Sequence, residues 1–255
     1  FDSGTVALAD GADLLVAATN NTGSGESPVT LLVADGESAV KLWDVNTTAD
    51  IRVVHGISDA PAVDVIANNE LVLIDALAFP MATDYLSVLP ADYLIDVVAD
   101  ADNSIVAIDD AAVTLETGMS YTAIANNELA APELDLLMDM PRRVATEAKV
   151  RIIHASPAAG SVDIYVTGDG EIADVDPAFA GVDYSTDALA ETGYVSLAAG
   201  EYFVTVTAAG TKEAAIATGS LMLDAGNVYT AIAVNGAIEG ALPQLILLDD
   251  FVATP

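Results

Sequence analysis

Carboxylates gathered in one short segment are the side chains with the clearest potential for chemistry. The segment holds four acids within eight residues: Asp169, Glu171, Asp174 and Asp176. Carboxylate oxygens are preferred ligands of Ca²⁺, and a loop can bring several of them to one ion. Acidic runs are more often simply solvated. The sequence therefore predicts that a calcium site, where the chain has one, lies in this loop, and it predicts no other cofactor.

The only two histidines, His55 and His154, raise the question of a hydrolytic triad. On paper, His55 could combine with Ser58 and Asp64. Three such residues in one short turn would not easily leave an oriented nucleophile beside an oxyanion hole. Each histidine also ends a stretch whose apolar residues would share its face of a strand. We expect both to be buried and hydrogen-bonded to the neighbouring serine turn or the following aspartate, and we expect no enzymatic activity.

Composition excludes several other classes of protein. The chain has 255 residues, with 39 acidic and seven basic side chains and a net charge of −32. Binding to nucleic acid or to anionic lipid depends on Lys and Arg, which are scarce. The absence of cysteine excludes disulfides, thiolate metal sites and cysteine nucleophiles. Aromatic residues make up only 5% of the chain, too few to predict the sugar-stacking cleft of a glycosidase.

The acidic surface also carries an expectation about the solvent. Like charges repel one another at low ionic strength, and the screening length falls from ~30 Å at 0.01 M salt to ~3 Å at 1 M. We therefore expect a protein that works in a saline environment and is more stable there.

The chain repeats itself, and the repeats predict its domains. Arg52-Val-Val-His55 returns as Arg151-Ile-Ile-His154, and Tyr121-Thr-Ala-Ile-Ala125 returns as Tyr229-Thr-Ala-Ile-Ala233. Matched blocks in one order indicate duplication. We predict three parts: the C-terminal half of a preceding repeat with a connector (1–50), a first full repeat (51–141) and a second full repeat (148–255).

The initial half repeat would expose apolar faces and strand edges, which is an aggregation hazard. We expect its missing strands either to precede Phe1 in a longer parent protein or to come from another chain by strand exchange. Truncation is the simpler explanation.

Local patterning predicts strands almost throughout. Short runs of alternating apolar residues are separated by turn sequences such as Ala199-Gly200 and Ala225-Gly226. Many short strands in each repeat are typical of a sandwich, so we predict an all-β protein of tandem Ig-like antiparallel β-sandwich domains. No apolar run approaches the ~20 residues that cross a bilayer.

Basic residues gather between the two full repeats. Four of the seven lie within ten positions: Arg142, Arg143, Lys149 and Arg151. We expect them to bridge the two acidic domains and fix their orientation, rather than to bind an anionic ligand.

One repeated segment resembles a known family. The stretch Arg52–Asp64 is similar to the opening signature of domain-of-unknown-function family 4397, and Arg151–Asp163 is its second copy. The resemblance covers both full repeats and, through the later strands, the initial half repeat. Members of this family are typically secreted or surface β-sandwich domains, often in tandem. The resemblance therefore implies an extracytoplasmic location and no particular activity.

These expectations combine into one functional hypothesis. We predict a non-enzymatic, secreted or cell-surface structural or adhesive protein, such as a stalk or filament component, that assembles through contacts between sandwiches. Its expected partners are other copies of itself or other surface proteins, with no nucleic acid and no membrane-spanning segment. The alternative is a surface module that binds calcium or carbohydrate, and a hydrolase ranks third.

Overall fold

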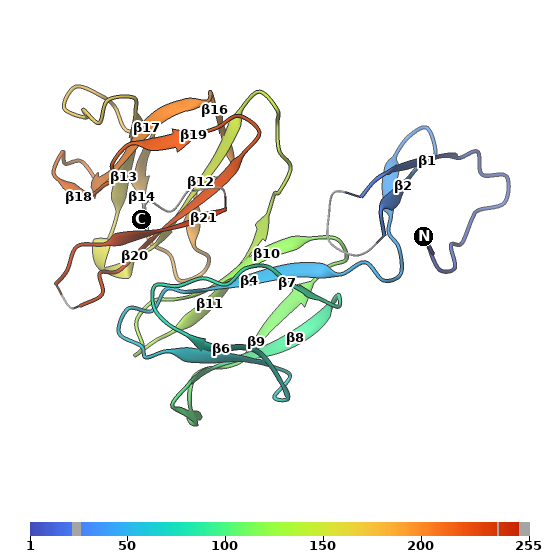
Figure 1. The fold of residues 1–255 in the computed structure, drawn as a ribbon, viewed down its shortest axis with the longest axis horizontal. Helices are drawn as coiled ribbons and strands as arrows, with labels where there is room; N and C mark the ends of the chain where they lie inside the picture. The colour runs from blue at the N-terminus through green and yellow to red at the C-terminus, as the bar shows by residue number, and fades with distance from the viewer. Residues whose placement is uncertain (22–26, 239, 250–255) are drawn as a thin grey trace.

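A computed structural model describes residues 1–21, 27–238 and 240–249 of the chain. Within these residues the regular structure is almost entirely β-strand, with one short 3₁₀ turn, η1 (Pro157–Ala159) (Figure 1). The predicted all-β class of tandem antiparallel sandwiches is confirmed. In the described part of the chain, no helix has the length and apolarity needed to cross a membrane.

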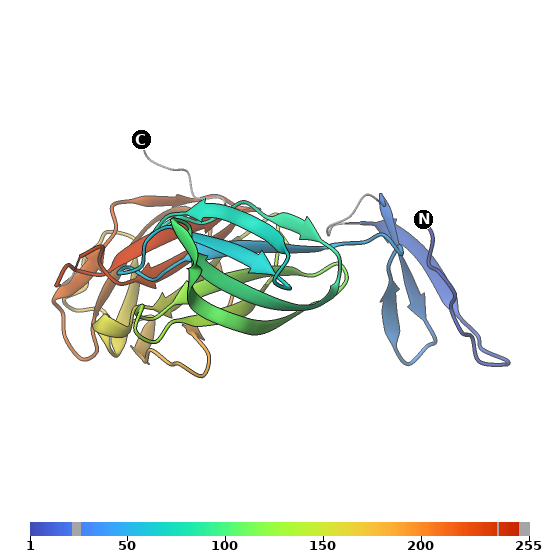
Figure 2. The ribbon, with the colours of Figure 1, turned by 90° about the horizontal axis from the view of Figure 1, so that it is seen from below.

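The first three strands form a small antiparallel sheet with the order β1-β2-β3. Its strands are β1 (Leu15–Asn20), β2 (Val29–Ala34) and β3 (Ala39–Leu42). Figures 1 and 2 both show this sheet at one end of the molecule, apart from the other sheets. One edge of β1 and one edge of β3 have no neighbouring strand among the described residues.

The next strands form a sandwich of two four-stranded sheets, with the orders β11-β10-β4-β7 and β6-β5-β8-β9. The strands of the first sheet are β4 (Ala49–His55), β7 (Leu86–Val88), β10 (Ser120–Asn126) and β11 (Glu133–Asp139). Those of the second are β5 (Val63–Ala67), β6 (Leu71–Leu77), β8 (Ala91–Ala99) and β9 (Asp102–Leu115).

The remaining strands form a second sandwich with the same plan. One sheet has the order β15-β12-β20-β21, with β16 also paired to β12. Its strands are β12 (Ala148–Ala155), β15 (Ala190–Glu191), β16 (Val195–Leu197), β20 (Val228–Val234) and β21 (Gln244–Asp249). The other has the order β14-β13-β17-β18, with β19 paired to β17. Its strands are β13 (Val162–Thr167), β14 (Phe179–Val182), β17 (Gly200–Ala208), β18 (Ala214–Ala217) and β19 (Leu221–Leu223).

One parallel pair interrupts the antiparallel pattern of each sandwich. Strand β4 runs parallel to β10, and β12 runs parallel to β20. These are the strands that carry the repeated Arg-x-x-His and Tyr-Thr-Ala-Ile-Ala sequences. Alternation along a strand indicates which side chains share a face, but it does not indicate the direction of the neighbouring strand.

Each sandwich encloses its own core, built from alternate residues of the strands. Val53 of β4 lies in one apolar cluster with Ala123 of β10 and Val65 of β5, so both sheets contribute to it. Ile152 of β12 lies in the corresponding cluster of the second sandwich with Ile164 of β13. The exact boundaries predicted for the repeats stay a prediction, and residues 239 and 250–255 of the last one lie outside the described residues.

Candidate functional site

A third apolar cluster lies between the two sandwiches. Its fully buried members include one large residue from each of β4, β10, β12 and β20: Val54, Ile124, Ile153 and Ile232. These residues alternate with the core residues of the same strands. The central strands are therefore buried on both faces, which explains their nearly continuous apolar sequences.

Two arginines meet carboxylates across this contact. Arg151 on β12 pairs with Asp139 on β11, and the two side chains are 0% and 2% exposed. Arg52 on β4 pairs with Asp249 on β21, with 2.5 Å between Nη1 and Oδ1. Each pair joins an arginine of one sandwich to an aspartate at the end of the last strand of the other. The contact is therefore reciprocal.

Asp139 is the centre of this network. Its Oδ2 accepts hydrogen bonds from Thr122 Oγ1 at 2.7 Å and from the Tyr85 hydroxyl at 2.6 Å. Arg52 lies near the same carboxylate, with Nε 3.9 Å from Oδ2, and its guanidinium lies over the Tyr85 ring. Burial and the nearby Asp139 carboxylate raise the pKa of the Tyr85 hydroxyl, so this group stays protonated and donates its hydrogen bond.

The connector that precedes each sandwich contacts a glycine turn of that sandwich, and the two turns are equivalent in the repeats. Trp43 packs on Gly118, where an added Cβ would lie 2.6 Å from the ring carbon Cη2. At the second sandwich, Arg143 Nη1 donates to Gly226 O at 3.1 Å and to Asn227 Oδ1 at 3.2 Å. The expected bridging role of the basic junction thus belongs to Arg151, while Arg143 holds the connector on the second sandwich.

The histidines are buried, as expected, and each bonds backbone atoms of the predicted serine turn. His55 Nε2 lies 2.9 Å from Pro61 O, and His154 Nε2 lies 2.7 Å from Gly160 O. The Nδ1 atom of each accepts the N–H of the residue two positions on, at 3.4 Å. This arrangement needs a neutral ring that carries its proton on Nε2. Each histidine therefore closes a loop between two strands, and neither bonds the serine side chain or the following aspartate.

A hollow of about 360 Å³ at one end of the second sandwich is lined mainly by small apolar residues. Its polar lining includes His154 and Asn235. Asn235 Oδ1 already accepts hydrogen bonds from Ser156 Oγ at 2.7 Å and from Ala158 N at 3.2 Å. These polar groups stabilise the loop beside the hollow.

The structure does not gather the acids predicted as calcium ligands into one group of ligand atoms: Asp169, Glu171, Asp174 and Asp176. Lys212 reaches into their loop instead. Its Nζ donates to Ile172 O at 2.8 Å and to Val175 O at 2.5 Å. The lysine ammonium thus uses carbonyl oxygens of the kind that calcium binds. Calcium binding by this loop stays a prediction.

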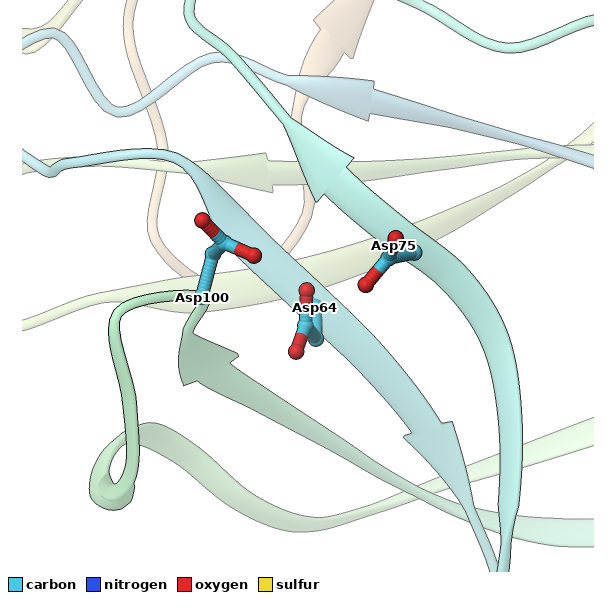
Figure 3. Close-up of side chains that lie close together, drawn as sticks. All are labelled: Asp64, Asp75 and Asp100. Atoms are coloured by element: carbon cyan, nitrogen blue, oxygen red, sulfur yellow. The ribbon is translucent and has the colours of Figure 1, made fainter.

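Two other carboxylate groups form in the first sandwich. Asp64 on β5, Asp75 on β6 and Asp100 in the turn after β8 place one oxygen each within 4.8 Å of one another. Figure 3 shows their carboxylates converging from three segments. Asp64 is buried, and the other two are exposed. The second group, on β8 and β9, comprises Asp96, Asp109 and Asp110.

The buried aspartates also have a structural task. Asp64 Oδ1 accepts the N–H of Ala76 at 2.9 Å, and Asp163 Oδ1 accepts that of Gly181 at 2.8 Å. Both donors have a positive φ, and both hydrogen bonds lie where the strand register shifts. The carboxylates therefore hold β-bulges, which leave a backbone N–H outside the ladder. Asp163 also accepts the Gly210 N–H, and these two bonds lower the pKa of its carboxyl.

Comparison with known proteins adds a family likeness. Residues 49–165 match the model of a family described as a domain of unknown function (DUF4397), which supports the resemblance over these residues. No curated protein matches the chain.

Two solved structures match the chain with low TM-scores and low identity. A family 26 carbohydrate-binding module from Eubacterium rectale, solved with maltoheptaose, is 9% identical with a TM-score of 0.27, covering 81% of this chain and 98% of that one. The TIE protein of Bacillus anthracis is 10% identical with a TM-score of 0.23, covering 87% of this chain and 41% of that one.

Proposed function

We propose that the chain is a non-enzymatic structural or adhesive module of a secreted or cell-surface protein, such as a stalk or filament component. The observation that supports this role best is the reciprocal, buried contact between the sandwiches. Two ion pairs and an apolar cluster join them. A contact of this kind holds two domains at one fixed angle, which is what a spacer requires.

The chemistry of the contact favours a fixed geometry over strong adhesion. A buried ion pair loses much of its Coulomb attraction to the cost of desolvating both charges. It still penalises every other arrangement, because a misplaced arginine or aspartate would be buried without its partner. The apolar cluster supplies attraction, and the Arg52 and Arg151 pairs select one orientation.

Distance measurements within the molecule test this role. The chain has no cysteine, so Glu70→Cys in the first sandwich and Glu213→Cys in the second can carry spin labels at two exposed positions. We expect one narrow distance distribution between the labels. A broad distribution in the otherwise unaltered chain would contradict a fixed spacer. The filament form is tested by electron microscopy of native material, where discrete monomers would contradict it.

Binding of a cation such as calcium at Asp64, Asp75 and Asp100 is a second candidate function. A difference between the sandwiches favours it. Beside the corresponding Asp163, Lys212 supplies a positive charge that helps to lower the pKa of the carboxyl. In the first sandwich, three carboxylates converge instead.

Thermal unfolding with calcium or with EDTA tests the second candidate. We expect calcium to raise the midpoint of the unaltered chain and to have no effect on Asp75→Asn/Asp100→Asn. Asp64 is left intact because it also holds a bulge. The matched control, Asp169→Asn/Glu171→Gln, alters two acids of the other loop and should keep the response. An unaltered chain that ignores calcium would rule this function out.

A further inference from the structure

The contact between the sandwiches has two similar halves that differ in polarity. In each half, a histidine ring lies edge-on to an aromatic ring of its own sandwich, with 6.1 Å between the ring centres. The aromatic residue is Phe79 beside His55 and Tyr184 beside His154, and both pack against the apolar cluster between the sandwiches. Phe79 has no polar group on its ring. The Tyr184 hydroxyl reaches the other sandwich, where it donates to Asn126 Oδ1 at 2.8 Å.

The last strand of each sandwich shows the same difference. Leu137 of β11 and Ile246 of β21 both pack in the apolar cluster between the sandwiches. Alternate residues of a strand share a face, so Glu133 and Asp135 face the second sandwich with Leu137. The pairing with β10 and with β20 makes Gln244 the counterpart of Glu133 and Ile246 the counterpart of Asp135. One half of the contact therefore has two acids where the other has an amide and an apolar side chain.

We call the half that contains Glu133, Asp135, Asn126 and Tyr184 the polar half. Its Asp135 is well compensated: Oδ1 accepts the Leu189 N–H of the second sandwich at 3.3 Å, and Oδ2 accepts Asn126 Nδ2 at 2.7 Å. Glu133 is not, because its Oε2 is buried and has no hydrogen-bond partner among the described residues. Burial without a donor disfavours the charged form of a carboxyl group.

The groups that act on Glu133 within the described part of the chain supply no positive charge. They are Asp135 on its own strand, Asn127 in the turn after β10, and Asp187 in the segment between β14 and β15. Burial and the two aspartates raise the pKa of the Glu133 carboxyl, and a hydrogen bond from Asn127 opposes them only in part. Burial, Glu133 and Asp135 also raise the pKa of Tyr184 to about 12, so its hydroxyl stays protonated and keeps its hydrogen bond.

We propose that the polar half of the contact is a pH-sensitive device, which is tightest when Glu133 is protonated and loosens when Glu133 is ionised. Protonation removes the repulsion between Glu133 and Asp135 and the cost of a buried charge. At higher pH the arginine pairs and the apolar half still join the sandwiches, so ionisation loosens one side without separating them. As a means of regulating the stiffness of a spacer, this inference rests on the proposed function.

Proton linkage gives the sign of the effect. Between the ordinary pKa of 4.5 and the raised value of the folded chain, the unfolded chain binds fewer protons at Glu133 than the folded chain does. The free energy of unfolding therefore falls as the pH rises through this interval, and the stabilisation is complete only below it. Glutamine has the size of Glu133 but no charge at any pH, and the second repeat carries Gln244 at this position. Glu133→Gln should therefore mimic the protonated form.

Denaturant unfolding at pH 8 and pH 5 tests the proposal. We expect Glu133→Gln to have a higher midpoint than the unaltered chain at pH 8 and a smaller gain at pH 5. The matched control is Glu70→Gln, which removes the same charge from an exposed turn between β5 and β6. It should change the midpoint little at either pH. His154, which touches the Tyr184 ring, titrates in all of these proteins, so the comparison at one pH cancels its contribution.

Hydrogen exchange locates the effect. At pH 8 the backbone amides of residues 183–189 should exchange more slowly in Glu133→Gln than in the unaltered chain, because the polar half opens less often. The two proteins are compared at the same pH, so their intrinsic exchange rates match. A difference spread evenly over both sandwiches would contradict an effect at this contact.

Three results of the unfolding experiment would overturn the proposal. They are no gain for Glu133→Gln at pH 8, an equal gain at pH 5 and pH 8, and an equal gain for Glu70→Gln. The first would mean that the ionised form carries no cost, the second that titration is not involved, and the third that only the total charge matters. None of them broadens the spin-label distance between Glu70→Cys and Glu213→Cys, so failure of this proposal is distinct from failure of the spacer role.

Discussion

Arg151 and Asp139 form a buried ion pair across the contact between two sandwiches, although only 12 residues separate them in the sequence. The short connector between β11 and β12 turns the chain from one sandwich into the other. The pair therefore joins the end of one domain to the beginning of the next.

Removing one member of this pair should be costly. Arg151→Met leaves Asp139 buried with less compensation, and we expect the free energy of unfolding to fall by about 3–5 kcal/mol. Asp139→Asn should cost at least as much, because it also weakens the contact with Arg52. The double variant should lose less than the sum of the two single losses. Denaturant unfolding measures all three, and Arg143→Met, at an exposed position, serves as the control with a much smaller loss. Additive losses would mean that the pair is not coupled.

Stability should decrease as the histidines become protonated. Burial lowers the pKa of both His55 and His154 from the ordinary value of 6.5. At pH values just below 6.5, the unfolded chain therefore binds more protons than the folded chain, and the free energy of unfolding falls as the pH falls. This stability is fully present at higher pH. Denaturant midpoints at pH 7 and pH 6 should differ in the unaltered chain more than in His55→Gln/His154→Gln. An equal pH response in both would contradict the assignment.

Gly118 should be intolerant of any side chain. Its φ of +71° is strained for other residues, and its Cβ would meet the Trp43 ring at 2.6 Å. Gly11 has a similar φ of +74° but nothing within 4 Å of a built Cβ. Gly11→Ala should therefore cost only the backbone strain, about 1–2 kcal/mol. We expect Gly118→Ala to cost more and to shift the Trp43 emission. Similar losses at the two glycines would show that the ring moves aside easily.

Salt should stabilise the fold. Raising NaCl from ~0.1 M to ~1 M shortens the screening length from ~10 Å to ~3 Å, so the repulsion among 39 acidic side chains decreases. We expect the thermal midpoint to rise over this range. The same test with sucrose, which does not screen charge, separates this effect from preferential exclusion. A flat or falling midpoint would contradict the saline hypothesis.

The sequence predicts strands and buried faces better than it predicts contacts between domains. The run Ile51-Arg-Val-Val-His55 shows the apolar face that holds Val53, but Val54 packs against the other sandwich. The second apolar face of β4 is explained only by its contact with the other sandwich. Arg52 lies inside a repeat, far from the basic junction, and its partner Asp249 is 197 residues away. No local pattern links these two residues.

The acidic sites show the same limit. Asp169 and its neighbours are close in the sequence, but Lys212 enters their loop from a distant turn. Asp64, Asp75 and Asp100 are separated in the sequence and converge only because β6 and β8 both pair with β5. Spacing along the chain identified the loop, whereas pairing between strands created the cluster.

The contact between the sandwiches also limits how a longer array of such domains can grow. Each sandwich contributes the outer face of its β10 or β20 sheet, and the partner already covers that face. A third domain cannot join in the same way, so arrays built on this plan would consist of pairs of domains. The distance from one pair to the next would then depend on connectors such as residues 43–48. An array with an odd number of domains would leave one sandwich without a partner.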